Sequence, residues 1–376
     1  MHASVSPDNP RIVIPVVAGV GNALMAVPMV RQLKRAKPNA QITVIARIHA
    51  MAEPFRRLPE VDEVLVTGNG WRGILKKLWW TRGRRADVYL VPFPSNRWQY
   101  NLLALLSGAR VRVMHRFPIG YWRAMAFVRA RRVPAVRGIH DVQQNLHLLE
   151  ALGIEPQLDD PPRFIVSDDD RARAAALLQR AEVDELTAFV ALHPGSGRTV
   201  IGKAKRWPPG RWAQFLARFR REFSHHVVLL EGPDEAGVGE EILRECEDDV
   251  TGLSVVRLTG PLGDAAAVLE RAQLYMGSDS GLAHLASAVG TKAVTIFAPA
   301  DPDRVCPFGY RDLVVQVNKD CSPCFHYPWR TPYPKLLCRE PYCVSEVRVD
   351  DVLDAVRRAM APLRVLVPSP SGRGIG

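Results

Sequence analysis

No stretch of this 376-residue chain is both apolar and unbroken for long enough to cross a membrane as a helix. The nearest candidate, residues 12–30, is nearly all apolar but is interrupted at five positions, Pro15, Gly19, Gly21, Asn22 and Pro28. Those residues break a continuous helix and favour a strand, a glycine loop and a helix in succession. We therefore expect neither a membrane span nor a cleaved signal peptide in this segment.

The sequence also lacks internal repeats and any recognised nucleic-acid-binding motif. It does not lack charge, because 50 Lys and Arg outnumber 39 Asp and Glu and give a formal net charge of +11 at pH 7. Such an excess attracts polyanions: nucleic acid, an anionic membrane surface or a phosphorylated glycolipid. Charge alone does not choose among them, but the missing motif disfavours nucleic acid as a partner.

With 47% hydrophobic residues, the chain is globular and long enough for two domains. In the first half, apolar strands alternate with helices, which predicts a parallel, doubly wound sheet. We expect these strands at residues 12–17, 41–46, 63–66, 88–91 and 109–113. A helix over residues 141–152 should end at Gly153. The acidic segment that follows, with Pro156, Pro161 and Pro162, suits an interdomain linker.

After a helix near residues 171–181, the second half repeats the alternation. Its strands are expected at residues 189–192, 227–230, 255–258, 274–276 and 293–296. The fold class is therefore α/β, with two Rossmann-like, doubly wound domains that face each other across a cleft. We expect domains at residues 1–160 and 161–350, followed by a C-terminal helix and a disordered tail at 351–376.

The segment GSDSGLAHLASAVGTKAVTIFAP, residues 277–299, reads as a strand, a short loop, a helix and a second strand. Unpaired N–H groups and the helix dipole favour an anion at a helix N-terminus, so Ser280, Gly281 and Leu282 could face a diphosphate. Phosphate would repel Asp279, for which a sugar hydroxyl is the better partner. His284, one turn into the helix, could reach a phosphate when protonated. The alternative is an ordinary capped core helix whose histidine binds a backbone carbonyl.

A second segment, ALHPGSGRTVIGKAKRWPPGRWAQF, follows the strand at residues 189–192. Gly195 and Gly197 let the backbone approach a ligand closely, and Ser196 adds a hydroxyl at the same place. Just beyond lies a basic run that includes Lys203, Lys205 and Arg206. A lysine ammonium suits a diphosphate leaving group, although such a cluster is often a solvated face.

The turn LLEGPDE follows the strand at residues 227–230. Asp234 or Glu235 could accept hydrogen bonds from a ribose diol there. A helix N-cap at Asp234 is the alternative.

Together, these segments resemble glycosyltransferase family 9, the heptosyltransferase family of lipopolysaccharide assembly. The likeness is carried by HPGSG with K-R-W-P, by LLEGPDE, and by SDSGLAHLASAVGTKAVTIFAP followed by Asp301 and Pro302; it extends from Ile12 to about Arg358. It implies the GT-B architecture, with the acceptor on the N-terminal domain and the nucleotide-sugar donor on the C-terminal one. It further implies ADP-heptose as the donor, although family members also use other sugars. The implied acceptor is a lipid-linked inner-core or other cell-envelope glycan.

The resemblance implies an inverting transfer that needs no metal or other cofactor. The acceptor oxygen attacks the anomeric carbon, while Lys205, Ser196 and the helix from Ser280 stabilise the departing diphosphate. In well-studied heptosyltransferases, the residue after the second glycine of the loop AGVGNALMAVP is an aspartate proposed as general base, but here it is Asn22. An amide has no useful basicity near neutral pH. Gly21 and Asn22 are still expected to contact the acceptor.

Three explanations of Asn22 remain: another carboxylate acts as base, proton loss is late and needs little help, or transfer activity has been lost. Asp141 and His140 are candidate bases, unless they only cap a helix. Asp279 is a weak substitute because its expected role lies with the donor sugar. If activity has been lost, the chain is a catalytically silent nucleotide-sugar or anionic-glycan binding protein. An epimerase or a phosphorylase is the rival function on the same fold.

Cysteine is scarce, but four of the six residues lie close together: Cys321, Cys324, Cys338 and Cys343. Four thiolates could hold a structural zinc, although the gap between the pairs is shorter than in the usual zinc ribbon. Reduced thiols in a packed loop, or a disulfide, are the alternatives. A cytoplasmic enzyme keeps its thiols reduced.

Two basic stretches with interleaved aromatic residues lie in the first half: WRGILKKLWWTRGRR, residues 71–85, and VRVMHRFPIGYWRAMAFVRARR, residues 111–132. This mixture suits an anionic membrane interface, and Arg84 and Arg85 are expected to help bind the acceptor. The alternative is a pair of helices with core-facing tryptophans and a solvated basic face. The expected location is cytoplasmic, peripheral on the inner face of the cytoplasmic membrane.

Overall fold

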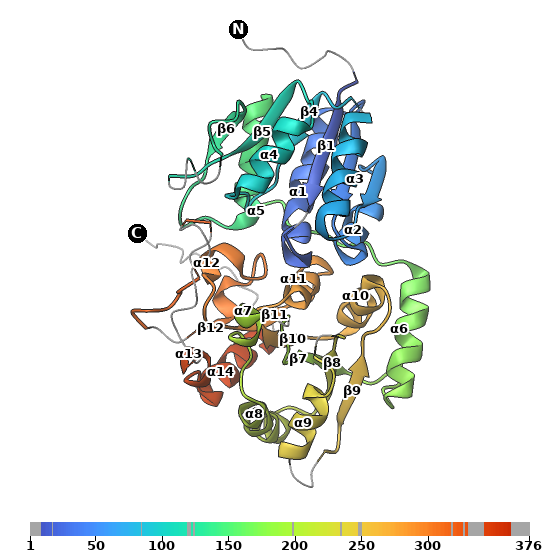
Figure 1. Ribbon diagram of the computed structural model, residues 1–376. Helices are drawn as coiled ribbons and strands as arrows, with labels where there is room; N and C mark the ends of the chain where they lie inside the picture. The colour runs from blue at the N-terminus through green and yellow to red at the C-terminus, as the bar shows by residue number, and fades with distance from the viewer. Residues whose placement is uncertain are drawn as a thin grey trace, which may run out of the picture.

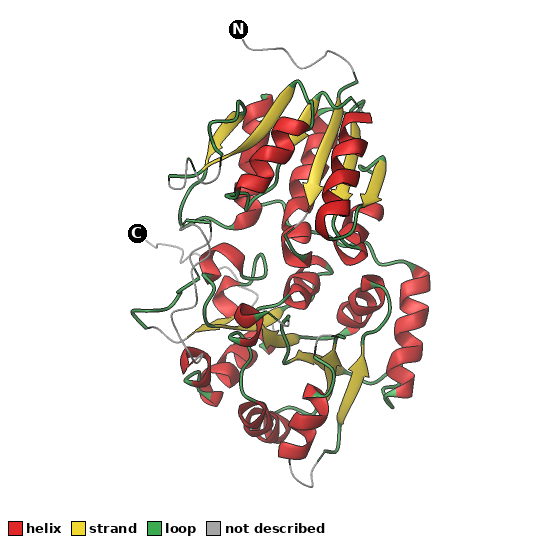
Figure 2. Ribbon diagram, in the orientation of Figure 1, coloured by secondary structure: helices red, strands yellow, loops and turns green. Residues whose placement is uncertain are grey.

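The computed structural model describes residues 9–361 except 17, 84, 119–121, 123–124, 198, 234, 247–249, 317–318, 326–327 and 330–341. The chain folds into two halves, each built on a six-stranded parallel sheet with helices packed against it (Figures 1 and 2). The predicted α/β class with two Rossmann-like sheets is confirmed. In the part of the chain described, no helix is long and apolar enough to cross a membrane.

The N-terminal sheet has the strand order β3-β2-β1-β4-β5-β6. Its strands are β1 (Arg11–Val16), β2 (Gln41–Ala46), β3 (Glu63–Val66), β4 (Val88–Leu90), β5 (Val111–Arg116) and β6 (Arg131–Pro134). The helices of this half are α1 (Val20–Ala36), α2 (His49–Arg56), α3 (Gly70–Gly83), α4 (Trp98–Leu106), α5 (Asp141–His147) and the 3-10 helix η1 (Leu148–Leu152). The order reverses between β1 and β4, and ligands of open α/β sheets bind at such a reversal, outside the carboxyl ends of the strands.

The C-terminal sheet has the order β12-β11-β10-β7-β8-β9, which is the same arrangement when counted from its own first strand. Its strands are β7 (Phe189–His193), β8 (His226–Glu231), β9 (Leu253–Arg257), β10 (Tyr275–Ser278), β11 (Ala293–Phe297) and β12 (Val314–Gln316). Its helices are α6 (Asp168–Arg180), α7 (Val200–Lys203), α8 (Pro209–Glu222), α9 (Val238–Glu245), α10 (Leu262–Arg271), α11 (Gly281–Ala288), α12 (Pro302–Val305), η2 (Arg311–Leu313), α13 (Tyr342–Ser345) and α14 (Val349–Met360). The reversal here lies between β7 and β10.

Apolar side chains on both faces of each sheet form the cores, as a parallel sheet covered by helices requires. Helix α14 packs into the core of the second sheet through residues such as Val352 and Leu353. The two halves also share apolar contacts, because Leu24 of α1 lies within a cluster of the second half and Phe308 packs against the core of the first.

The helix expected over residues 141–152 is α5 followed by η1, and it ends at Gly153 in the left-handed conformation predicted for a C-cap (φ 74°). The proline-rich segment after it is tied to α1. Asp160 pairs with Arg31 at 3.0 Å and with Arg35 at 2.8 Å. The segment is therefore anchored to the first half up to residue 160.

Candidate functional site

Two loops, one from each half, meet at the junction of the sheets where α1 and α11 begin (Figure 1). The first joins β1 to α1, whose first turn contains Gly21; the second joins β10 to α11, which begins at Gly281. A Cβ built on Gly281 would lie 3.4 Å from the Cβ of Val20. A Cβ built on Gly21 would lie 2.6 Å from Cδ2 of His284, too close for any side chain. Glycine at position 21 thus lets the imidazole of one half pack on the backbone of the other.

Lys205 reaches the start of α11 and pairs with a carboxylate there. Its Nζ lies 2.6 Å from Oδ2 of Asp279, within ion-pair distance although not aligned as a hydrogen bond. The Asp279 side chain is buried and that of Lys205 is 19% exposed. Ser196 Oγ donates to the backbone carbonyl of Asp279 at 3.3 Å. The HPGSG and SDSG segments, far apart in sequence, therefore form one polar site, whereas the Lys203 side chain is exposed.

A second group of buried side chains also links these two segments by hydrogen bonds. His193 Nδ1 lies 3.1 Å from Ser280 Oγ, and the hydroxyl of Tyr275 lies 3.2 Å from that oxygen. His193 Nε2 is 3.8 Å from Oε2 of Glu235. Burial alone would raise the pKa of Glu235, but His193 and Arg206 together lower it below its ordinary value. Glu235 is therefore ionised at neutral pH and orients His193 toward Ser280.

Glu235 also explains a glycine of the HPGSG loop. A Cβ on Gly195 would lie 2.2 Å from Cγ of Glu235, so the predicted close approach at Gly195 is made by a side chain of the protein itself. Gly197 has open space around its Cβ position. Arg206 donates to the carbonyl of Ser196 and braces this loop. Asp234, the other predicted ribose partner, lies outside the described residues.

His193, Tyr275 and Arg206 were not predicted as site residues. Each stands inside or beside a motif that was recognised: His193 at the end of β7, Tyr275 at the start of β10 and Arg206 in the basic run. A polar side chain at the carboxyl end of a buried parallel strand was the available signal for His193. For Arg206, which binds a backbone carbonyl through a tertiary contact, the sequence offers no such signal.

The imidazole of His284 makes no hydrogen bond with any residue that the structure describes, so the predicted bond to a backbone carbonyl is not found there. His284 as a whole is 8% exposed to solvent. Burial lowers the pKa of His284 to about 4; Asp279 opposes this shift and Lys205 adds to it. The imidazole is therefore neutral at neutral pH in this arrangement, and the phosphate contact through a protonated ring stays a prediction.

The alternative bases at positions 140 and 141 are both engaged. His140 Nδ1 accepts a bond from the Val142 N–H at 3.2 Å, and Nε2 lies 2.8 Å from the carbonyl oxygen of Cys306. The Asp141 carboxylate is buried against the guanidinium of Arg304. His140 caps α5, which agrees with the structural alternative for these residues rather than with a base.

The predicted acceptor contact at Arg85 is corrected by its place in the fold. Arg85 is exposed and precedes β4, at the amino end of the sheet, whereas Gly21 and Asn22 follow the carboxyl end of the neighbouring strand β1. The two positions thus lie at opposite ends of the strands of one parallel sheet. Arg84 lies outside the described residues.

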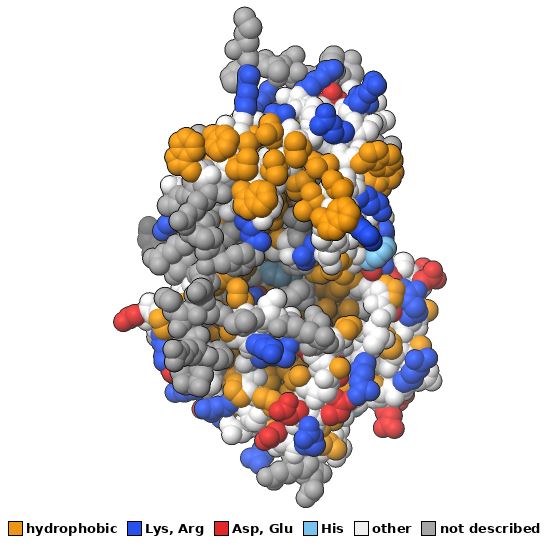
Figure 3. Space-filling model, viewed as in Figure 1, with side chains coloured by type: hydrophobic (Ala, Val, Ile, Leu, Met, Phe, Trp, Pro, Cys, Tyr) orange, Lys and Arg blue, Asp and Glu red, His pale blue; other side chains and the backbone are white. Residues whose placement is uncertain are grey.

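The basic and aromatic stretches of the first half instead shape its outer surface. Figure 3 shows hydrophobic side chains gathered across the N-terminal half, with Lys and Arg side chains around them. The exposed large residues of α3, of α4 and of the segment between β5 and β6 include Trp71, Trp79, Trp98, Trp122 and Phe127. Trp79 is 71% exposed and Trp122 is 76% exposed, so these two do not face the core as the alternative interpretation required.

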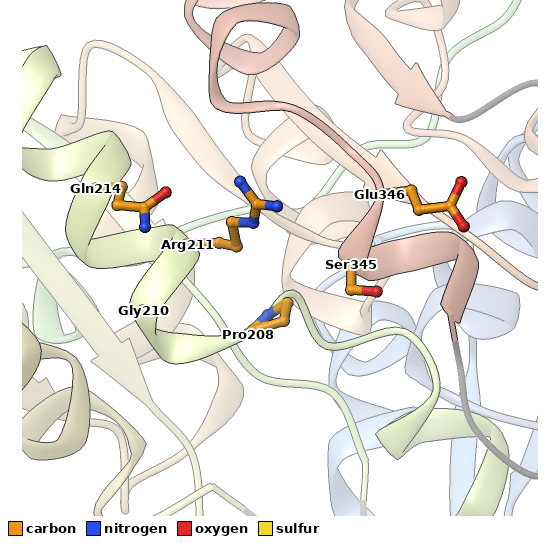
Figure 4. Close-up of a pocket in the computed structure, with 6 residues that line it drawn as sticks. All are labelled: Pro208, Gly210, Arg211, Gln214, Ser345 and Glu346. Carbon is orange, nitrogen blue, oxygen red and sulfur yellow. The ribbon is translucent and has the colours of Figure 1, made fainter.

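An open pocket lies away from this junction. Figure 4 shows its six lining residues, Pro208, Gly210, Arg211, Gln214, Ser345 and Glu346, at the start of α8 and the end of α13. None of them belongs to the two facing loops, so the pocket does not coincide with the site described above.

Comparison with known proteins identifies the family of this chain. Residues 102–333 match Glycosyltransferase family 9 (heptosyltransferase), and the chain belongs to that family. Lipopolysaccharide heptosyltransferase 3 of Escherichia coli strain K12 is 26% identical over 298 residues, which span 75% of this chain and 80% of the relative. The protein is thus a glycosyltransferase by family.

Solved structures of the family have the same fold. The E. coli ADP-heptose LPS heptosyltransferase II superposes with a TM-score of 0.69 at 20% identity and covers 93% of this chain and 98% of its own. The iron-containing dodecameric glycosyltransferase TibC of enterotoxigenic E. coli gives a TM-score of 0.57 at 14% identity, over 94% of this chain and 76% of that chain. The predicted GT-B fold is confirmed by these likenesses.

The described cysteines do not test the predicted zinc site. Cys321, Cys324 and Cys343 form no disulfide with a described residue, and Cys338 lies outside the described residues. Among the residues described, no three His, Cys, Asp or Glu side chains lie together as metal ligands would. Since one of the four predicted ligands is not described, the zinc site remains a prediction.

Proposed function

We propose that the protein is an inverting heptosyltransferase that moves heptose from ADP-heptose to a lipid-linked inner-core or other cell-envelope glycan. The observation that carries this proposal is the Asp279–Lys205 ion pair, placed at the start of α11 and opposite the Gly21 loop. Support for the sugar and nucleotide comes from the relatives named as heptosyltransferases and from the TibC structure in complex with ADP-D-beta-D-heptose.

The donor diphosphate would bind at the N-terminus of α11, against the N–H groups of Gly281 and Leu282. Lys205 is half-buried and within reach of the same space, so it would turn from Asp279 to the phosphate as negative charge grows on the leaving group. Asp279 would then accept a hydrogen bond from a sugar hydroxyl. His193 and Glu235 hold Ser280 in place from beneath.

The acceptor would enter from the N-terminal half, beside Gly21 and Asn22. The side chain of Asn22 can accept and donate hydrogen bonds and so can orient an acceptor hydroxyl. In this proposal the reaction proceeds through the protein's own cation and helix N–H groups, with no catalytic metal.

The outer surface of the first half would hold the enzyme on the inner face of the cytoplasmic membrane. Exposed tryptophans suit the headgroup region and the neighbouring arginines suit anionic lipid, which is also where a lipid-linked acceptor lies. This arrangement would bring the acceptor to the cleft from the bilayer.

The test is product formation from ADP-heptose and a lipid A precursor that carries inner-core sugar, followed by mass spectrometry. A panel of nucleotide sugars, read out by release of the nucleoside diphosphate, identifies the donor. Tight binding of ADP-heptose with no transfer or hydrolysis would favour the silent binding protein, which the asparagine at position 22 makes the second candidate.

A further inference from the structure

Five of the described acidic side chains around the junction are held by partners. Asp279 pairs with Lys205, Asp141 with Arg304, Glu235 with His193 and Asp170 with Arg57, while Glu53 accepts the N–H groups of Leu262 and Gly263. A carboxylate that is held in this way is a poor proton acceptor, since its partner stabilises the charged form. The described carboxylates named here therefore do not replace the aspartate that position 22 lacks.

One basic group at the junction is left without such a partner. The ring of His284 packs against Gly21, and its Nε2 would lie 3.1 Å from a Cβ at that position. Gly21 directly precedes Asn22 in the first turn of α1. In the described part of the chain, no donor occupies either ring nitrogen. The imidazole belongs to the donor half, yet it faces the backbone on which the acceptor would rest.

We propose that His284 is the catalytic base of this chain and that its Nε2 removes the proton of the acceptor hydroxyl, which the side chain of Asn22 orients. This inference rests on the proposed transfer function. In the step, the acceptor oxygen forms a bond to the anomeric carbon as its proton passes to His284. The bond from the anomeric carbon to the diphosphate oxygen breaks, and ADP leaves with the electron pair. The imidazolium then releases its proton to solvent.

Three titratable groups face the ring: Asp279 and Lys205 from the donor site and His140 from the first half. Burial keeps the ring neutral, so a lone pair is present at neutral pH. A diphosphate at the N-terminus of α11 adds negative charge beside the ring and would raise its pKa toward neutrality. The base would therefore strengthen when the donor is bound, and an imidazolium formed next to ADP would be stabilised by it.

The test compares wild type with His284→Ala in transfer from ADP-heptose to the lipid-linked inner-core acceptor. We expect kcat to fall by roughly 10²- to 10⁴-fold, the usual contribution of a general base. Binding of ADP, measured by calorimetry, should change little. Added imidazole should restore part of the turnover in His284→Ala and none in wild type. Ser287→Ala is the matched control on the same helix, because Ser287 only donates to the carbonyl of Phe308.

A second variant separates a base from a structural role. In the double variant His284→Ala with Asn22→Asp, the new carboxylate should restore transfer. The acid limb of its pH–rate profile should report the pKa of that carboxylate, whereas the acid limb for wild type should report the pKa of His284. Full activity in His284→Ala, or a loss that neither imidazole nor Asn22→Asp repairs, would overturn the inference while wild-type transfer stands. Absence of any transfer by wild type would instead defeat the proposed function, and the inference with it.

Discussion

The carboxylate of Asp141, from the first half, accepts three hydrogen bonds from the guanidinium of Arg304, from the second, at 2.9 to 3.1 Å. Both side chains are buried, and the guanidinium carbon lies 5.4 Å from the ring centroid of Phe93. Burial raises the pKa of Asp141 to about 6, although Arg304 opposes the shift. The two halves are thus joined by a charged pair that water does not reach.

Removing one partner of this pair should be costly. We expect Asp141→Ala to lower the free energy of unfolding by about 3–5 kcal/mol, because the buried guanidinium of Arg304 loses its carboxylate. Arg348→Ala, which removes an exposed pair with Asp351, should cost less than about 1 kcal/mol. Urea unfolding followed by circular dichroism measures both. Equal losses in the two variants would show that the buried pair contributes no more to the free energy of unfolding than an exposed pair.

Lys205 and Lys203 differ in environment and should differ in effect. Lys205→Ala should lower turnover by roughly 10²-fold or more with the fold intact, as loss of one preorganised contact to a developing anion commonly does. The exposed Lys203, changed to Ala, should have a much smaller effect. Steady-state transfer from ADP-heptose is the measurement. Equal small effects at both positions would contradict the proposed contact between Lys205 and the leaving diphosphate.

Asn22→Asp distinguishes the explanations of the missing aspartate. If no base acts in the wild-type enzyme, the substitution should raise kcat, because a basic group is added beside the acceptor. If another group acts, such as His284, the rate should stay unchanged or fall. The assay is single-turnover transfer at saturating donor. A clear gain in rate with His284 intact would favour the account in which proton loss is late.

His115 should make stability depend on pH. Its ring packs against those of Phe93 and Phe117. Neither ring nitrogen has hydrogen-bond geometry with a described partner, although the backbones of Val133 and Gln144 lie near. Burial lowers its pKa to about 3, below the value of 6.5 for the unfolded chain. The stability from the neutral ring is present above pH 6.5 and is lost as pH falls toward 3.

His115→Phe lacks that proton linkage. Between pH 7 and pH 5 its loss of unfolding free energy should be about 2 kcal/mol smaller than that of wild type. Thermal or urea unfolding at the two pH values gives the comparison. Identical pH dependence in both proteins would mean that His115 titrates normally in the folded state.

Membrane attachment is tested by sedimentation with vesicles. Binding should require anionic lipid, fall as salt rises, and weaken when Trp79, Trp80, Arg84 and Arg85 are replaced together, since each basic residue near the surface contributes about 1 kcal/mol. Replacement of Arg211 and Arg221 on α8 removes two arginines from the other half and should have little effect. Binding that ignores both salt and the first set of changes would contradict the proposal.

Local pattern predicts much of this fold because a buried parallel strand is an apolar run bounded by turn residues, as in β2 and β11. The edge strands β6 and β12 were missed for a physical reason. Both are short and only partly buried. Strand β6 is built from RRVP, which neither hydrophobicity nor propensity marks, and β12 has only three residues. The helix at residues 141–152 was predicted because its C-cap glycine is a local signal.

The candidate site was predicted only as separate motifs. HPGSG and SDSG each carry local turn and helix-start chemistry, so their residues could be named. The packing of His284 on Gly21, the pair between Asp141 and Arg304, and the contact of Glu235 with Gly195 join segments that are distant in sequence. Without an alignment to show covarying positions, no periodicity or spacing reports such contacts.

The anchoring of Asp160 to α1 sets the mechanics of opening. Residues up to 160 are tied to the first half through Arg31 and Arg35, and the N–H of Phe164 donates to the carbonyl of Ala288 in the second. The pivot between the halves is thereby confined to residues 161–163, two of which are prolines with a fixed φ. So short and stiff a hinge would let the halves rotate about nearly one axis. Each closure would then return the first turn of α1, with Gly21, to the same position against α11.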